Sequence, residues 1–567
     1  MCVRLVPLGG LGEIGMNALV LEDGDDAILI DCGLTFPDEE VGVDVIHADF
    51  GYALSLGKRL KAVVLTHGHE DHIGAIPFLP ADVRVPVYGP PLALELTRSR
   101  LAEYPLGYAP DLRPTAPRSP FHVGSLEIEP ISVTHSIPDS TALAIRTSIG
   151  TVIHTGDFKV DLDPPDGRRF DLQRLSEHGA SGVALLLSDS TNVEQEGMTG
   201  GEKQVAAEIR RAVAEAEGGR IFITLFSSNV VRLQAILDCA RQDGRRVAFA
   251  GRSIQRHVDA AVRLGTLDFR SDLVLPLDQA PSHPRDRLLV VISGTQGEPR
   301  SSLTRLSSGE HRLLSVEDGD TVILSSRHIP GNELAISRVI DNLARLGARV
   351  VHAGNRPGIH ASGHAHREEQ KLMIQLVRPR MFVPVHGTYQ DLALHARLAR
   401  ELGVEQTLLV ENGQVAEVTR TGLCRGGTVP CGRVHRDGAH DVDDDVLRER
   451  RALADSGLAV AFVVLDRKHR LAADPNVTCR GVLGDDNAAG FLSGASGRLR
   501  ETVESAPEGV RSQHALLRER CRRELRRYFQ DAVGRKPLAL VGLTVLGEDI
   551  LFPEDDDEGP GARLPRL

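Results

Sequence analysis

Three histidines and an aspartate lie within one short segment, Thr66-His67-Gly68-His69-Glu70-Asp71-His72, which directly follows the apolar run 62–65. Imidazole and carboxylate groups are ligands for borderline metals such as zinc, and a strand that ends in a tight loop can direct several of them at one point. Few structural roles need histidines at this density. This segment, which we call the metal motif, therefore predicts a metal-dependent hydrolase.

One ion cannot bind all four of these side chains, because Asp71 and His72 are adjacent and diverge from His67 and His69. Two ions about 4 Å apart fit better, and sites of this kind catalyse hydrolysis and phosphoryl transfer. More ligands must then come from elsewhere in the chain. The sequence offers three of them after apolar strands, namely His135, Asp157 and His386.

The expected ligands of one ion are His67, His69 and His135, and those of the other are Asp71, His72 and His386. The carboxylate of Asp157 can then bridge the two ions. A single histidine of this kind is more often a hydrogen-bonded structural residue, so the interpretation depends on the whole set. His154, which lies inside a predicted strand, is expected to be structural.

A β-rich layer must position these ligands. The sequence predicts strands at 3–8, 18–22, 27–31, 62–65, 83–88, 126–133, 142–147 and 151–154. Helices are expected on the outside of this layer. The glycines from Gly10 to Gly15 match the dinucleotide-binding fingerprint, but that fingerprint requires a helix to follow, and a hairpin is predicted instead. These glycines are therefore expected to form a tight loop beside the metal site.

From Thr199 the pattern changes to alternating helices and strands. A helix is predicted along the apolar stripe 205–216, a buried strand at 220–225, a helix at 229–241 and a strand at 246–250. This alternation is typical of an α/β unit with a parallel sheet. After Gly363, a helix at 368–377 leads to a strand that ends at His386. The α/β unit is therefore expected to be inserted into the sandwich domain.

The length of 567 residues is too great for a single core and agrees with such a division. The expected parts are the sandwich (1–202), the insertion (203–362), the return of the sandwich (363–440), a linker (441–456), a small C-terminal α/β domain (457–553) and a disordered tail (554–567). The C-terminal domain includes an arginine-rich helix at 511–529. A solvated face is the default interpretation of that helix, and a role facing RNA or another subunit is the alternative.

The composition, 41% hydrophobic and 25% charged, is that of a globular chain without a membrane span or signal peptide, which favours the cytoplasm. Seven cysteines without a CxxC pair indicate reduced thiols, and Cys424 and Cys431 are spaced too widely for a finger-type metal site. The net charge of −12 argues weakly against broad coating of nucleic acid, yet it allows a local basic channel.

Other motifs accompany the metal motif in a fixed order. They are 8–17 (LGGLGEIGMN), 29–37 (LIDCGLTFP), 155–159 (TGDFK), 187–192 (LSDSTN), 251–253 (GRS), 362–364 (SGH) and 384–387 (PVHG). In order and spacing they resemble the metallo-β-lactamase superfamily, within it the β-CASP nucleases, and most closely the bacterial ribonuclease J family. The resemblance implies a metallo-β-lactamase αββα sandwich with an inserted β-CASP α/β domain and a small C-terminal α/β domain.

The resemblance also implies two zinc ions, with manganese possible, and places Asp189 where it orients a ligand imidazole. The expected catalytic residues are Asp71, Asp189 and His364, the last as donor of a proton or hydrogen bond to the leaving 3′-oxygen. The expected contacts of the RNA 5′-phosphate, which we call the phosphate site, are Ser227, Ser228, Asn229, His360, Ala361, Ser362, Gly363 and His364. An ordinary helix N-cap is the alternative for the first three of these, and Arg252 is a weaker candidate.

The implied function is a ribonuclease with 5′-to-3′ exonuclease and endonuclease activity in mRNA decay and rRNA maturation. It would act on single-stranded RNA with a 5′-monophosphate and form a homodimer or homotetramer. The alternatives are a small-ester hydrolase of the same superfamily, which needs no large insertion, and a DNA-directed β-CASP nuclease, because phosphate contacts carry no sugar identity. A non-catalytic scaffold is disfavoured because every expected ligand position is filled. His47 and Ala361 depart from the usual family residues without removing a ligand.

Overall fold

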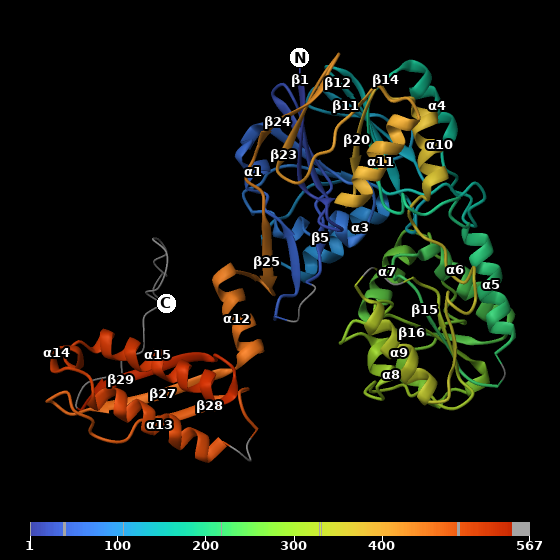
Figure 1. Cartoon of the computed structure of the whole chain (residues 1–567). Coiled ribbons are helices and arrows are strands. Elements are labelled where there is room, and N and C mark those ends of the chain that lie inside the picture. Colours follow the sequence, from blue (N-terminus) through green and yellow to red (C-terminus); the bar gives the residue numbers. More distant parts are fainter. Residues whose placement is uncertain are drawn as a thin grey trace. The chain divides into compact units, whose positions relative to one another are not determined.

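The computed structural model describes residues 2–546 apart from 38–40, 106, 217, 328, 330 and 485–487. The expected disordered tail, 554–567, lies outside these residues. The chain divides into two compact units (Figure 1). The first unit contains the residues up to 36 together with 45–434, and the second contains 37–44 and the residues from 435 onward.

Two mixed sheets form the sandwich of the first unit. The first sheet has the order β24 (Leu423–Thr428), β23 (Gln414–Thr419), β1 (Cys2–Gly9), β3 (Ala18–Asp23), β4 (Asp26–Ile30), β7 (Leu60–Val64), β8 (Val87–Gly89) and β9 (Leu112–Pro114). The second has the order β10 (Phe121–Val123), β11 (Leu126–Ser132), β12 (Thr141–Thr147), β13 (Gly150–His154), β14 (Val183–Asp189), β20 (Met381–Val385) and β22 (Gln406–Thr407).

The inner faces of the two sheets bury an apolar layer in which Ile28 and Val64 of the first sheet share a cluster with Leu143 and Leu187 of the second. The outer faces are covered by α1 (Gly51–Ser55) and α3 (Pro91–Glu103) on one side and by α4 (Leu172–Ser181), α10 (Arg367–Val377) and α11 (Tyr389–Glu401) on the other. This arrangement is the αββα sandwich that the sequence predicts.

Parallel pairing brings distant segments together at one edge of the sandwich. β4 pairs with β7, so the residues that follow Ile30 lie beside those that follow Val64. β13 pairs with β14, and β14 pairs with β20, whose residues are separated from it in sequence by the whole insertion. Since the carboxyl ends of parallel strands meet at the same edge, the loops after these strands can share one site.

The insertion is an α/β unit around a parallel sheet, as predicted. Its strands have the order β16 (Arg246–Ala250), β17 (Leu288–Ile292), β15 (Ile221–Thr224), β18 (Thr321–Leu324) and β19 (Arg349–Val351). One face packs against α5 (Glu202–Ala214), α6 (Val230–Gln242) and α7 (Arg252–Arg263), and the other against α8 (Ser302–Ser307) and α9 (Glu333–Arg345) (Figure 1).

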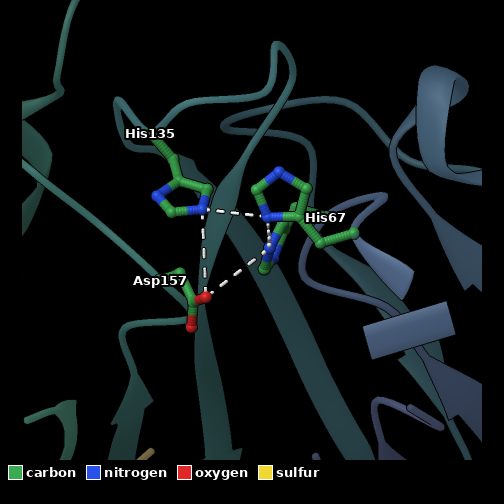
Figure 2. Close-up of side chains that lie close together, drawn as sticks. His67, His135 and Asp157 are labelled. Atoms are coloured by element: carbon green, nitrogen blue, oxygen red, sulfur yellow. Dashed lines mark hydrogen bonds and ion pairs between the residues drawn. The ribbon is translucent and has the colours of Figure 1, made fainter. Parts of the chain in front are cut away.

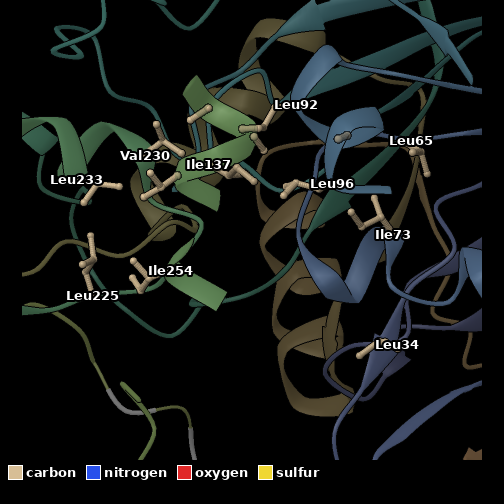
Figure 3. Close-up of a cluster of buried hydrophobic side chains, with 14 of the residues drawn as sticks. Leu34, Leu65, Ile73, Leu92, Leu96, Ile137, Leu225, Val230, Leu233 and Ile254 are labelled. Carbon is tan, nitrogen blue, oxygen red and sulfur yellow. The ribbon is translucent and has the colours of Figure 1, made fainter. Parts of the chain in front are cut away.

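The insertion and the sandwich share one apolar cluster. Figure 3 shows Leu92 and Leu96 of α3 and Ile137 of the sandwich in the same buried group as Val230 of α6 and Ile254 of α7. A continuous core of this kind holds the two parts together through burial of apolar area rather than through the connecting segments alone.

The second unit contains a sheet of order β28 (Asn476–Arg480), β27 (Leu458–Leu465) and β29 (Leu538–Val545), with α13 (Ala488–Glu504), α14 (Glu508–Arg511) and α15 (His514–Val533). One face of the sheet alternates buried residues, such as Ala459, Val463 and Val541, which pack against Leu499 and Leu525 of the helices. The arginine-rich helix predicted at 511–529 is thus α14 followed by α15.

Two expectations differ from the structure. The expected linker, 441–456, is folded, because β26 (His440–Val442) pairs with β25 (Arg433–Asp437) and α12 (Asp444–Ser456) follows. Asp444 and Asp445 in the first turn of α12 favour a helix through the helix dipole.

The strand expected at 83–88 is reduced to β8, because the proline at position 86 has no N–H to donate to the hydrogen-bond ladder of the sheet.

Shorter elements of the first unit are β2 (Leu11–Gly12), β5 (Leu34–Thr35), β6 (Val45–Ala48), α2 (Glu70–Ile73), β21 (Gly387–Thr388) and the 3₁₀ turns Gly57–Arg59, Ile76–Phe78, Leu277–Ser282 and Arg285–Arg287. Among all the helices in the described part of the chain, none has both the length and the apolar character required to cross a bilayer.

Candidate metal centre

The metal motif occupies the turn after β7 and the first three residues of the short helix α2. Its first histidine, His67, is buried, and the Cβ that a residue other than glycine would add at Gly68 would meet Leu96 Cδ1 at 3.0 Å and Ile137 Cδ1 at 3.3 Å. The turn is therefore packed against α3, which leaves its polar side chains directed at the edge where the other strand ends converge.

One group of ligand atoms forms around His69. Its Nδ1 lies 3.0 Å from Nε2 of His67 and 3.1 Å from Nε2 of His135. Asp157 Oδ2 completes the group, 3.7 Å from Nε2 of His67 and 3.9 Å from Nε2 of His135. Figure 2 shows His67, His135 and Asp157 directed toward a common point. The ligand atoms of the group all lie within 4.8 Å of one another.

A second group shares Asp157. Oδ2 of Asp157 lies 3.2 Å from Nε2 of His72 and 3.5 Å from Nε2 of His386. Oδ2 of Asp71 lies 3.6 Å from Nε2 of His72 and 3.5 Å from Nε2 of His386. The structure thus brings all seven expected ligands together, in two groups with Asp157 between them.

Each imidazole of the two groups is held through its other ring nitrogen. The pairs are His67 Nδ1 with Thr66 Oγ1 (3.0 Å), His69 Nε2 with Ser228 Oγ (2.9 Å), His135 Nδ1 with Gly363 O (2.6 Å), His72 Nδ1 with Asp31 Oδ2 (2.8 Å) and His386 Nδ1 with Thr191 Oγ1 (2.8 Å). Partners of this kind fix the ring orientation and tautomer of metal-binding histidines. The inner nitrogens of the five rings face the two groups.

The electrostatics of the first group also fit a bound cation. Burial, together with neighbouring histidines, lowers the pKa of His67 and of His135 well below the ordinary value, which favours the neutral form that binds metals. Although burial opposes it, His386 and His72 hold the pKa of Asp157 well below its usual range. Nε2 of His386 is buried without a hydrogen-bond partner among the described residues. Burial of such a nitrogen costs free energy of folding unless a ligand satisfies it.

Backbone strain occurs where two of these strands end. Asp31 and His386 have φ values of 59° and 53° in the left-handed region. A residue with a Cβ in this region costs on the order of 1–3 kcal/mol, and such residues concentrate at functional sites. In both cases the turn directs a side chain toward the metal centre.

Family models match successive parts of the chain. The model of the metallo-β-lactamase superfamily matches residues 11–252, and that of the ribonuclease J β-CASP domain matches 218–343. The Zn-dependent metallo-hydrolase RNA specificity domain matches 350–409, and the ribonuclease J C-terminal domain matches 445–544.

Relatives match over most of their length. Ribonuclease J of Synechocystis sp. is 41% identical over 85% of this chain and 76% of that protein. Ribonuclease J2 of Bacillus subtilis is 36% identical over 95% of this chain and 98% of that protein, and ribonuclease J of Thermus thermophilus is 38% identical over 95% and 94%. The chain belongs to the ribonuclease J family. A crystal structure of a protein of unknown function from Enterococcus faecalis V583 shares the fold, with a TM-score of 0.51, 17% identity and coverage of 73% of this chain and 99% of that one.

Asp189, which the ribonuclease J resemblance expects to orient a ligand imidazole, and His364, the expected proton donor, lie beside the second ligand group. Asp189 is buried, and its Oδ2 accepts a hydrogen bond from Nδ1 of His364 at 2.8 Å while its Oδ1 lies 3.3 Å from Nδ1 of His386. Nε2 of His364 lies 3.9 Å from Oδ2 of Asp157. Burial opposes a charge on His364, yet Asp189 raises its pKa above the ordinary value.

The first half of the phosphate site lies where β15 meets α6. The hydroxyl of Ser227 lies 2.9 Å from that of Ser253, and Ser228 contacts His69 as described. Asn229 is the N-cap of α6, where its side chain accepts a hydrogen bond from the backbone N–H of Arg232. The Asn229 side chain therefore serves the helix, and a ligand here would contact the two serine hydroxyls in addition to their present partners.

The second half of the phosphate site is the segment from His360 to His364. Nη1 of Arg232 lies 3.0 Å from Nδ1 of His360, and Nη2 of Arg232 donates to the carbonyl of Ala361 at 3.2 Å. The hydroxyl of Ser362 accepts a hydrogen bond from Asn192 at 3.0 Å. Gly363 passes so close to His135 that an added Cβ would meet Cε1 of that ring at 2.8 Å. This segment therefore positions a ligand of the first group as well.

Several residues at the centre had no assigned role in the sequence. Asp31, Thr66 and Thr191 hold ligand imidazoles, and Nδ2 of Asn17 lies 3.1 Å from Nε2 of His72. Asp31 had a usable signal, since it ends a strand that a parallel pairing would place beside the metal motif. The glycine loop lies beside the centre as expected, because an added Cβ at Gly10 would meet Oδ1 of Asn17 at 2.2 Å.

Three other histidines have structural roles. Nδ1 of His154 accepts from the backbone N–H of Gly156 at 3.1 Å, as expected for a structural residue. His366 is the N-cap of α10, and its backbone N–H donates to Glu369 at 2.9 Å. His47 stacks between the rings of Phe50 and Phe78.

Proposed function

We propose that this protein is a metal-dependent ribonuclease that hydrolyses RNA from the 5′-end and also internally, in mRNA decay and rRNA maturation. The two ligand groups that share Asp157 carry this proposal. A pair of metal ions in such a site supplies a nucleophile from water and neutralises phosphoryl oxygens. The nitrogen and carboxylate donors suit zinc, and they accept manganese as well.

In this proposal Asp189 and His364 act on the leaving group. The carboxylate of Asp189 fixes the ring of His364 through Nδ1, so that Nε2 faces the metal centre with its proton. The raised pKa of His364 keeps that proton available near neutral pH. Donation to the 3′-oxygen would leave a 3′-hydroxyl on one product and a 5′-phosphate on the other.

The phosphate site adjoins the metals, which supports action at the 5′-end. The hydroxyl of Ser228 contacts the ligand His69, so a terminal phosphate bound between Ser227 and the segment 360–364 lies next to the metal centre. Backbone N–H groups at the start of α6 add favourable charge for an anion. With the 5′-monophosphate held there, the first phosphodiester bond of the RNA would lie at the metal centre.

Ser227→Ala should reduce the preference for 5′-monophosphate RNA. A hydrogen bond to a charged group contributes about 1.5–3 kcal/mol, so the preference over 5′-hydroxyl RNA should fall roughly tenfold to a hundredfold. The ratio of cleavage rates on two RNAs of the same sequence, one with a 5′-monophosphate and one with a 5′-hydroxyl, measures this preference. Ser228→Ala is a poorer probe, because it also removes the partner of His69. An unchanged preference in Ser227→Ala would place the phosphate elsewhere.

We also propose a cytoplasmic homodimer or homotetramer. The seven cysteines are free, which suits a reducing compartment. The separate C-terminal unit is the part that the family resemblance associates with self-association.

The function is tested by supplying purified protein with zinc or manganese and four substrates: 5′-monophosphate RNA, 5′-triphosphate RNA, matched DNA and a small thioester. We expect mononucleotides chiefly from the monophosphate RNA, internal cleavage of both RNAs, and little change in the DNA and the thioester. Intact RNA together with a hydrolysed thioester would favour the small-ester alternative, and equal cleavage of DNA would favour a DNA-directed nuclease.

A further inference from the structure

Four charged side chains form a closed ring where the sandwich meets the insertion. Nη1 of Arg256 lies 3.1 Å from Oε1 of Glu70, and Nε of Arg100 lies 3.2 Å from Oε2 of the same residue. Nη1 of Arg100 lies 3.0 Å from Oε2 of Glu103, and Nη2 of Arg256 donates to the other oxygen of Glu103. Each carboxylate therefore lies between two guanidinium groups, and the charges alternate around the ring.

This ring touches the metal motif directly. Glu70 begins α2 and immediately precedes the ligands Asp71 and His72. Its side chain extends toward α3 and α7, away from the ligand groups. Arg100 and Glu103 belong to α3 of the sandwich, so Arg256 of α7 is the member that the insertion contributes.

The insertion therefore contacts two consecutive residues of the metal motif. Ser228 of the phosphate site contacts His69, and Arg256 contacts Glu70. Beneath these polar contacts, Leu96 of α3 and Ile254 of α7 share the apolar cluster described above (Figure 3). The turn that carries the ligands is thus held by the insertion as well as by its own sheet.

An isolated exposed ion pair would contribute little, about 0–1 kcal/mol. The ring differs because its arginines are shielded, with 8% of the Arg100 side chain and 21% of the Arg256 side chain exposed, although Glu70 is 30% and Glu103 39% exposed. Each arginine also contacts both carboxylates through different nitrogens of its guanidinium group, which a point charge cannot reproduce. The ring can therefore fix geometry even where it adds little stability.

We propose that Arg256 is a positioning residue, which acts through Glu70 to hold Asp71 and His72 in place for metal binding and hydrolysis. The proposal rests on the assignment of those two residues as metal ligands. It predicts that loss of Arg256 loosens metal binding and slows the chemical step, while binding of RNA is unchanged.

The test compares Arg256→Met with Arg263→Met. Arg263 lies on the same helix and pairs with Glu95 of α3 at 2.6 Å, but this pair does not touch the metal motif. We expect Arg256→Met to lower kcat about tenfold, the smaller end of the range for groups that orient metal ligands, with KM unchanged. Arg256→Met should also release zinc to a chromogenic chelator several times faster than the parent protein does. Arg263→Met should match the parent in both measurements.

Two more variants keep the test decisive. Arg256→Lys should recover only part of the loss, because one ammonium group cannot contact both carboxylates. Glu70→Gln removes a charge from the opposite side of the ring and should speed zinc release as Arg256→Met does. If Arg256→Met fails to fold, zinc release from Glu70→Gln tests the proposal instead. Equal zinc release from Arg256→Met and Arg263→Met would overturn the proposal, as would a change in KM alone. A parent protein that retains zinc but cleaves no RNA would refute the proposed function, and zinc release would still report on the ring.

Discussion

Asp157→Asn should abolish metal binding and RNA hydrolysis together. Oδ2 of Asp157 lies 3.2 Å from His72, 3.5 Å from His386 and 3.7 Å from His67, so one oxygen serves both ligand groups. Asparagine keeps the shape but removes the charge. Loss of the Lewis-acid contribution, several kcal/mol, should slow cleavage on the order of a thousandfold or more.

Metal content by plasma mass spectrometry and the initial rate on labelled RNA measure this effect. Asp163→Asn is the matched control, because Asp163 lies in the same segment but is 73% exposed and pairs with Lys203. We expect it to retain both metal and activity. If Asp157→Asn kept the full metal content, Asp157 would not be the shared ligand.

Glu202→Gln should cause a large loss of stability. Glu202 is 5% exposed, and its Oε1 lies 2.8 Å from Nη2 of Arg232 and 3.2 Å from Nζ of Lys159. Both cations are 1% exposed, so the variant leaves them buried without the carboxylate. Removal of one partner from a buried ion pair costs about 3–5 kcal/mol. Lys159 belongs to the sandwich and Arg232 to the insertion, so both parts should be affected.

The effect of Glu202→Gln should depend on pH. Although burial opposes ionisation, Arg232 and Lys159 lower the pKa of Glu202 from 4.5 to about 2. A carboxyl whose pKa is depressed in the folded state adds stability above its unfolded pKa, and this stability is lost as the pH falls through the folded value. The difference between parent and variant should therefore be complete above pH 4.5 and shrink toward pH 2.

Chemical denaturation across this pH range measures the difference. Glu215→Gln is the control, because Glu215 also contacts two arginines, Arg356 at 2.7 Å and Arg349 at 2.8 Å, but is 46% exposed. Solvent screens such a contact, so the change should be much smaller. Similar losses in the two variants would show that burial does not set the strength of the Glu202 interactions.

The convergence of the candidate ligands could be predicted from the sequence because its members follow apolar strands. The metal motif is contiguous, and Asp157 and His386 come shortly after strands that pair in parallel at one edge. The groups that orient the ligands carry a weaker signal. Gly363 acts through its backbone carbonyl, and Ser228 reaches His69 across the contact between sandwich and insertion.

Contacts between side chains that are distant in sequence are even harder to predict from the sequence. Arg256 and Glu70 are separated in sequence by most of the first part of the sandwich and by the first third of the insertion, and arginines are common in the sequence. The charges of the segment 441–456 suggest a linker, but most of the segment forms α12, because Asp444 and Asp445 in its first turn favour a helix.

The pairing of β14 with β20 constrains when the enzyme can become active during synthesis. β14 has emerged before the insertion is made, but its parallel neighbour lies beyond it, so that edge stays unpaired until residues 381–385 are available. His386 follows directly and completes the second ligand group. A nascent chain that still ends within the insertion therefore lacks both the parallel neighbour of β14 and His386, so the second group of candidate ligands can assemble only after the insertion has been made.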